Sequence, residues 1–234
     1  MNIFLPKNFE SQKPIKIYDY QDMMITLFSP HINPHNFSIN QLQEMEVIPS
    51  HWQLSKPVLN KSQSLQFCFK SGIIIIINVG NISVIGKISN NAFNLTKIVN
   101  NFVKKFYQYN WQRIQINLRR LISLPGDKTN GKKFINETLL QSKKWDILGI
   151  KPVKAQVTLM YSFPDFPLMI NIKDVKVKDN NQKIKSALLF KGIFNYNLTS
   201  KYNHKIKYLY SIINNNSQNI EIFNQIIEEN FLSE

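Results

Sequence analysis

The sequence predicts an α+β protein, mainly an antiparallel β-sheet with helices packed on one face. Alternating apolar and polar residues, which are typical of strands with one buried face, recur in both halves of the chain. Turn sequences as short as Ser71-Gly72 separate some of these runs, and such tight links join antiparallel strands. Apolar residues spaced three and four apart between positions 95 and 106 predict a helix that packs on the sheet.

The chain is expected to begin with an arm over residues 1–18. A strand is predicted at 20–28, and a loop rich in Pro, His and Asn follows it at 29–36. Ser38 is the expected N-cap of a short helix at 39–46, because a serine hydroxyl accepts a hydrogen bond from the first free amides of a helix.

Three strands are predicted next. The first, at 65–69, has apolar residues at alternate positions. The second, at 73–79, is continuously apolar, which is typical of a strand that is covered on both faces. The third is expected at 82–88, after a turn at Gly80-Asn81.

A helix of about 18 residues is predicted from Asn90 or Asn91, with lysines away from its apolar side. The segment 111–121 then alternates and predicts a half-buried strand with one polar, basic face. Its inward residues are Ile114, Ile116 and Leu118, and its outward residues are Arg113, Gln115, Asn117 and Arg119.

The second half is predicted to repeat this mixture of elements. A loop at Pro125-Gly126-Asp127 leads to a helix at 132–143. Two C-terminal helices are expected, with a break at 214–216 and Ser217 as the cap of the second. Between these helical regions the predicted strands are 154–163, 168–178 and 185–198.

The predicted units are an N-terminal arm at 1–18, a first α+β half at 19–126 and a second at 127–234, unless the halves form one continuous domain. An internal duplication would explain why Trp52 and Pro57 are echoed by Trp145 and Pro152, at offsets of 93 and 95 residues. The alternative is a coincidence between two segments that each precede predicted strands and contain Trp and Pro.

The chain is strongly basic, with 29 Lys+Arg against 15 Asp+Glu in 234 residues and a formal net charge of +14. Only three of the cationic residues are Arg. Lys, Asn and Ile share AT-rich codons, so genome composition alone could account for the excess of Lys. The charge is nevertheless uneven: residues 91–213 carry a net +16, which keeps a binding surface in that region as a hypothesis.

Several classes of protein are not expected. The single Cys excludes an internal disulfide and a zinc site built from cysteines, and Cys68 is expected to be a buried, small apolar residue. No signal peptide is expected at the N-terminus. The five isoleucines at 73–77 are far fewer than the roughly 20 apolar residues of a membrane helix. A cytoplasmic location is therefore the expectation.

Five segments carry a resemblance to known proteins: VIPSHWQL (47–54), SGI (71–73), IQIN (114–117), FINETLL (134–140) and FNYNL (194–198). In their order and spacing the chain resembles a family of conserved, uncharacterised cyanobacterial proteins. It departs from that pattern at Glu46 and Gln115, where the family has Gly, and in its many Lys and Asn residues. The resemblance implies an intracellular cyanobacterial protein and brings no activity with it.

No residues are predicted to hold a metal or a cofactor. His31 and His35 have the spacing of a helical metal pair, but Pro30 and Pro34 break the helix, and no acidic or Cys partner is near. No Gly-rich phosphate loop or nucleophile elbow occurs. An enzyme would need a site built from scattered residues.

The arginines give the sharpest functional hypothesis, because all three fall in one predicted strand. Arg binds carboxylate or phosphate in a planar, bidentate manner that Lys does not reproduce. The aromatic residues at 107, 109 and 111 could stack on bases beside such a strip. The alternative is that the arginines pair with Asp174 or Glu137 inside the fold and that the aromatic residues are core. The candidate anion- or partner-binding residues are Arg113, Gln115, Asn117, Arg119 and Arg120, flanked by Lys104, Lys105, Lys132 and Lys133.

The leading functional hypothesis is a non-enzymatic, cytoplasmic binding or assembly protein whose basic sheet face contacts an anionic partner. That partner is an acidic protein surface or a nucleic acid. The alternatives are a sequence-nonspecific nucleic-acid-binding protein and an enzyme with an unrecognised site.

Overall fold

The computed structural model describes residues 20–124, 128–140, 154–178, 184–198 and 205–232. These residues form an α+β fold around one nine-stranded sheet, with strand order β2-β3-β4-β5-β1-β6-β9-β8-β7. Every neighbouring pair is antiparallel, as the sequence predicted. The strands are β1 Tyr20–Phe28, β2 Leu59–Lys61, β3 Ser64–Cys68, β4 Ile74–Asn78, β5 Asn81–Lys87, β6 Arg113–Ser123, β7 Gln156–Ser162, β8 Pro167–Lys178 and β9 Ile184–Asn197.

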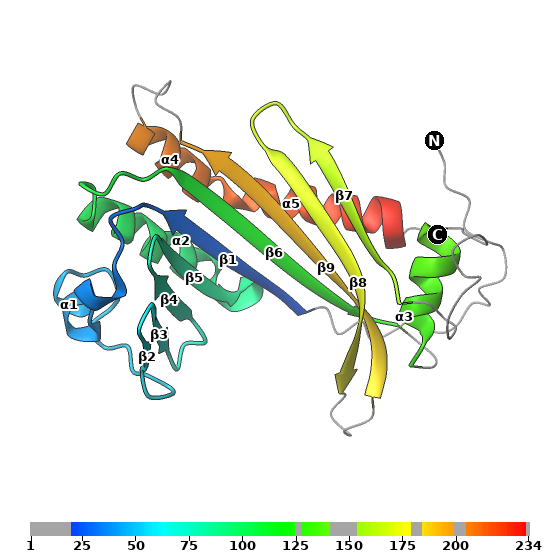
Figure 1. Cartoon of the computed structure of the whole chain (residues 1–234), viewed down its shortest axis with the longest axis horizontal. Coiled ribbons are helices and arrows are strands. Elements are labelled where there is room, and N and C mark those ends of the chain that lie inside the picture. Colours follow the sequence, from blue (N-terminus) through cyan, green and yellow to red (C-terminus); the bar gives the residue numbers. More distant parts are fainter. Residues whose placement is uncertain (1–19, 125–127, 141–153, 179–183, 199–204, 233–234) are drawn as a thin grey trace.

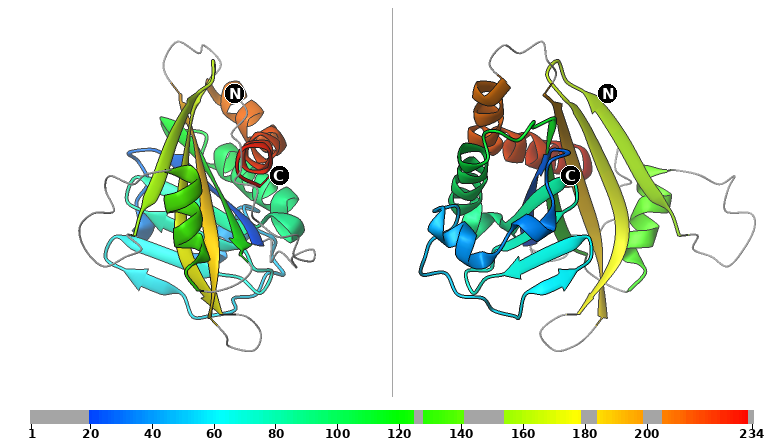
Figure 2. Two further views of the ribbon diagram at one scale, coloured as in Figure 1. Left: turned by 90° about the vertical axis from the view of Figure 1, so that its right-hand side faces the viewer. Right: turned by 60° about the vertical axis from the view of Figure 1, so that its left-hand side comes forward.

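The helices connect these strands and follow the last of them. In Figure 1, α2 and α5 pass behind the central strands. Figure 2 (left) shows α2, α4 and α5 together on one side of the central strands, so the helices form a layer on one face. The helical segments are η1 Pro34–Asn36, α1 Ile39–Glu44, α2 Ile88–Lys105, α3 Asn130–Lys133, η2 Phe134–Leu139, α4 Lys205–Asn214, α5 Asn216–Ile227 and η3 Glu228–Leu232.

The hydrophobic core lies between the sheet and this helix layer. On β1, Met23, Ile25 and Leu27 are almost completely buried. The strand register continues each of them onto β6 and β9, as in the row Ile25, Ile116 and Phe194. Burying such rows against α2 and α5 is the main favourable term for the fold, at roughly 25 cal/mol per Å² of apolar surface.

Most predicted strands are confirmed to within about two residues, and β1 matches at both ends. The expected N-cap is also present, since Ser38 Oγ accepts a hydrogen bond from the amide of Gln41 at 3.2 Å. That helix ends at Glu44, two residues early, and Glu46 then has a left-handed backbone with φ 55°.

Four local predictions are wrong. The run at 73–79 is not covered on both faces, because β4 buries Ile75 and Ile77 but leaves Ile74 and Ile76 half-exposed. The long helix α2 begins at Ile88, before the expected caps.

The other two wrong predictions concern the later helices. The expected helix at 132–143 is a short α3 that continues as a π-helix, η2, to Leu139; positions 141–143 are outside the described residues. Ser217 lies inside α5, and the residue at its N-cap position is Asn215.

One sheet runs through both predicted halves, because β6 of the first half pairs with β9 of the second along eleven residues. The predicted arm and the echo at Trp145 and Pro152 fall outside the residues that the structure describes.

Tyr196 ties the core to α5 and gives the fold a pH dependence. Its hydroxyl donates a hydrogen bond to Asn219 Oδ1 at 2.7 Å, and burial raises the pKa of Tyr196 to about 12. A tyrosine with a higher pKa in the folded than in the unfolded state stabilises the fold below the unfolded pKa of 10. That stabilisation is lost as the pH rises from about 10 to about 12.

We therefore expect the free energy of unfolding of the wild type to fall between pH 10 and 12, and to fall less steeply in Tyr196→Phe. Urea unfolding across this range measures both slopes. Tyr107→Phe is the matched control, because Tyr107 is 73% exposed. Equal slopes for the wild type and Tyr196→Phe would contradict the assignment to Tyr196.

Candidate partner-binding face

The side of the sheet opposite the helix layer is its open face. Alternate residues of each strand point to this side, and within the described part of the chain no helix lies over it (Figure 1). On β6 the open-face residues are Arg113, Gln115, Asn117 and Arg119, because the residues between them belong to the core. The prediction that these four share one face is confirmed.

A band of mostly apolar residues crosses the open face from β3 to β7. Each strand from β3 to β7 contributes one residue, and the register places these residues side by side. On β6 the contributor is the polar Asn117, which is 3% exposed and donates a hydrogen bond to Gln115 Oε1 at 3.2 Å. In spatial order the band is Cys68, Ile74, Ile85, Met24, Asn117, Ile193, Met169 and Met160.

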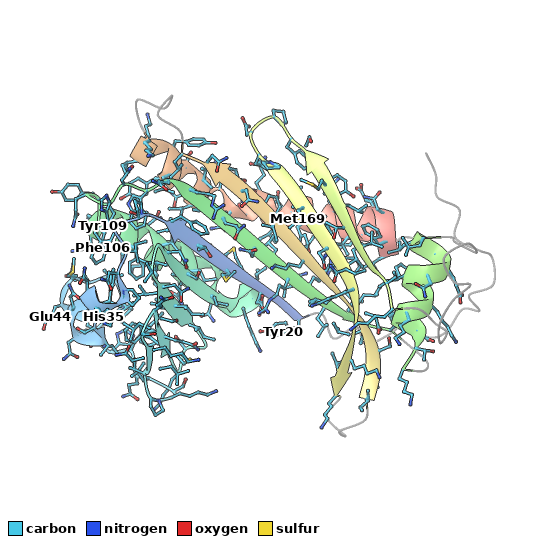
Figure 3. All side chains as sticks on the ribbon, viewed as in Figure 1. Tyr20, His35, Glu44, Phe106, Tyr109 and Met169 are labelled. Carbon is cyan, nitrogen blue, oxygen red and sulfur yellow. The ribbon has the colours of Figure 1, made fainter. Side chains whose placement is uncertain are left out.

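Met169, labelled in Figure 3, marks the part of the band on β8. Met160 at the end of the band is 74% exposed, and most of the other members are half-buried. An apolar strip, interrupted at Asn117, on a face that none of the described helices covers is a feature expected of an interaction site. The sequence did not predict the band, because each strand supplies only one of its members.

Polar rows border the band on both sides. On one side Gln115 Nε2 donates to Asn195 Oδ1 at 2.8 Å, and Thr26 and Ser83 share a hydrogen bond of 2.9 Å. On the other side the register gives the row Lys87, Asp22, Arg119, Lys191, Asn171 and Thr158. The open face is thus an apolar strip between two hydrogen-bonding edges.

Arg119 and Asp22 form a bidentate pair inside the second of these rows. Arg119 Nε donates to Asp22 Oδ1 at 2.7 Å, and Nη2 donates to Oδ2 at 2.6 Å. The carboxylate is 2% exposed, whereas half of the arginine side chain is accessible. The hydrogen bond to Asp22 raises the pKa of Arg119, so the guanidinium stays charged. The proposed pairing with Asp174 or Glu137 is wrong for this arginine, since its partner is Asp22.

The other two arginines differ from Arg119. Arg113 lies over the ring of Phe28, with its guanidinium carbon 3.9 Å from the ring centroid. Arg120 points to the helix side, where its Nη1 donates to Glu228 Oε1 at 2.9 Å. Arg120 is therefore not part of the open face.

The four flanking lysines also lie elsewhere. Lys104 and Lys105 are at the end of α2 in the helix layer, and Lys105 pairs with Glu46 at 3.5 Å. Lys132 and Lys133 are on α3, which packs on the helix side through the amide of Gly131. The structure does not bring these lysines together with Arg113 and Arg119.

Other cations do lie on the open face, and sequence reasoning missed them. Among the described strand residues on this face the single carboxylate is that of Asp22, so the face is basic. Its lysines are Lys61, Lys87, Lys173, Lys185 and Lys191. Their outward position at alternate strand residues was the available signal.

No family model and no curated protein matches this chain.

The expected base-stacking residues do not form an exposed cluster. Trp111 is 1% exposed and belongs to the core, and Tyr109 is half-buried against it. Each aromatic ring on the described strands of the open face has a cation over it: Lys87 Nζ lies 5.1 Å from the centroid of Tyr20, which is 41% exposed, and Arg113 lies over Phe28.

The described residues include no group of three or more His, Cys, Asp or Glu side chains placed to hold a metal. The prediction that Cys68 is buried is wrong, because it lies half-exposed at the end of the band. Its sulfur accepts a hydrogen bond from Gln66 Nε2 at 3.2 Å. None of the described helices is both long enough and apolar enough to cross a membrane.

Proposed function

We propose that the protein is a non-enzymatic binding or assembly protein whose open face contacts an acidic protein surface. The observation that carries this proposal is the apolar band with a basic border. A partner that is complementary to this face is a protein with an apolar strip and carboxylates beside it.

The chemistry of the open face supports a protein partner. Protein interfaces combine an apolar centre with a polar rim, which is the arrangement of the band and its two borders. Met24, Met169 and Met160 give the band flexible side chains that adapt to a facing surface. The lysines of the border then attract carboxylates and steer the encounter.

Nucleic acid is the alternative anionic partner, and it fits this face less well. Binding to single strands uses exposed aromatic rings as stacking platforms. On the open face Tyr20 and Phe28 already lie under cations. The best-placed guanidinium, Arg119, already has both oxygens of Asp22 as acceptors.

The test replaces apolar residues of the band. Ile85→Lys/Met169→Lys is expected to lower capture of the partner from cytosol by at least about tenfold, because a lost interface anchor costs about 1–2 kcal/mol or more. Phe93→Lys is the matched control: Phe93 is 78% exposed on α2, away from the open face, so the control should keep full capture.

Quantitative mass spectrometry of the captured proteins measures both effects. Equal capture by the band variant and the wild type would contradict the proposal. Capture that is removed by nuclease, and falls linearly with salt on logarithmic axes, would instead support nucleic-acid binding.

Three further expectations belong to this proposal. Membership of the cyanobacterial family is proposed on the resemblance of the five segments alone. A cytoplasmic location accords with a chain that has one cysteine. An internal duplication is supported by the strand order, which runs β1-β5-β4-β3 outward from the centre on one side and β6-β9-β8-β7 on the other. In such a duplication β6 would open the second unit.

A further inference from the structure

The two ends of the sheet differ in how their edges are protected. β2 closes one end with only three residues, all of them exposed, and it ends in Lys61. Short edge strands and lysines are devices that stop another strand from pairing. The edge at β2 is therefore closed to further strands.

The opposite edge, at β7, lacks these devices. β7 spans seven residues, Gln156–Ser162, with the sequence QVTLMYS, which contains no charged residue and no proline. It is the last strand of the sheet and pairs with β8 on one side only. Its outer backbone amides and carbonyls have no strand partner in the described part of the chain. A long, uncharged edge of this kind is a template for an added strand.

We propose that β7 pairs antiparallel with β7 of a second copy of the chain, so that two sheets join across a twofold axis. Backbone hydrogen bonds between the two edges hold the dimer, in the manner of β-strand addition. The proposal concerns the edge of the sheet and does not depend on what the open face binds.

Charge favours a second copy as the occupant. A twofold interface brings each residue close to the same residues of the other copy. For a chain with a net charge of +14, most self-contacts would bring lysines together, but β7 has no charge to repel its copy. Self-pairing is thus least costly at this strand.

The residues that flank β7 add an attractive term. Lys154 precedes the strand and Asp165 follows it, and both are exposed. In antiparallel pairing centred on Leu159, Lys154 of each copy lies near Asp165 of the other. The two lysines lie at opposite ends of the interface and do not repel each other.

The apolar surface is also continuous across such an edge. Val157, Leu159 and Tyr161 point to the helix side and are only half-buried. Met160, on the open face, is 74% exposed and ends the apolar band. With the pairing centred on Leu159, Val157 of each copy lies opposite Tyr161 of the other, and Met160 lies opposite Thr158, so pairing would cover these side chains.

The test is the molar mass in solution. The chain has a mass of 27.5 kDa, so sedimentation equilibrium of the wild type should give about twice this value. Thr158→Lys/Met160→Lys places four lysines across the axis on the open-face side and should return the mass to that of the single chain. Val79→Lys/Phe93→Lys adds the same charge at exposed positions away from β7 and should remain dimeric.

Two results would overturn the proposal: a wild type that stays monomeric up to its solubility limit, or a dimer that survives Thr158→Lys/Met160→Lys. Circular dichroism establishes that each variant is folded. If the edge variant does not fold, amide exchange of the wild type decides instead. The amides of β7 should then become more protected as the protein concentration rises, and constant protection would overturn the proposal.

Discussion

Replacing Arg119 by alanine is expected to lower the free energy of unfolding by about 2–3 kcal/mol, because it leaves a buried carboxylate without its ion-pair partner. Asp22 is 2% exposed and loses two charge-assisted hydrogen bonds in this variant. An ordinary exposed ion pair would contribute less than about 1 kcal/mol. The difference arises because only the arginine end of this pair reaches water.

Arg119→Lys separates charge from geometry. Lysine keeps the positive charge but does not form the two parallel hydrogen bonds, so we expect an intermediate loss of about 1–2 kcal/mol. Urea unfolding at neutral pH measures both variants. A loss below about 0.5 kcal/mol for Arg119→Ala would show that the pair behaves as a surface pair.

Lys87 provides an internal check on this result. It lies opposite Asp22 on the neighbouring strand, with its ammonium group over Tyr20. In Arg119→Ala it can move to the free carboxylate and reduce the loss. Arg119→Ala/Lys87→Ala should therefore be less stable than the sum of the single variants predicts.

The largest expected loss of stability is about 3–5 kcal/mol, for Phe223→Ala. Phe223 on α5 is 2% exposed and packs against Gly192 of β9, where the absent side chain makes room for the ring. Removing the ring leaves a cavity between the helix layer and the middle of the sheet. Phe93→Ala removes the same side chain from an exposed position on α2, and its effect should stay within about 0.5 kcal/mol.

The glycine gives the reciprocal test. A Cβ at position 192 would lie 2.6 Å from Cδ2 of Phe223, so Gly192→Ala should cost about 1–3 kcal/mol through overpacking. In a Phe223→Leu background, Gly192→Ala should lower the free energy of unfolding by less than it does in the wild type. Leucine is smaller than phenylalanine and leaves room for the added Cβ. Additive losses, measured by thermal unfolding in a double-mutant cycle, would contradict this packing.

The sequence predicted the fold class and most strands because periodicity is local. Alternation of buried residues places β6, and a spacing of three and four residues places α2. The errors arise where tertiary contacts decide. The sequence of β4 predicts burial on both faces, yet Ile74 and Ile76 are only half-buried. The helical segment that begins at α3 continues as a π-helix.

The candidate site could be predicted only in part, because it depends on register between distant strands. Alternation alone put Arg113, Gln115, Asn117 and Arg119 on one face. The partner of Arg119 lies 97 positions earlier in the chain, and no local pattern identifies it. Nor does any single strand reveal the apolar band, which exists only once the strands are aligned.

The first described strand, β1, lies in the middle of the sheet, and this position affects how the protein is made. During synthesis β1 can pair with β5 as soon as β5 has left the ribosome, but its other edge must wait for β6. β6 ends 36 residues after the end of β5, which corresponds to about 2–7 s of translation at 5–20 residues per second. Throughout this interval the nascent chain presents a nine-residue unpaired edge. Because an unpaired strand edge can pair with another chain, we expect the yield of native protein to rise when a chaperone covers this edge or when elongation is rapid.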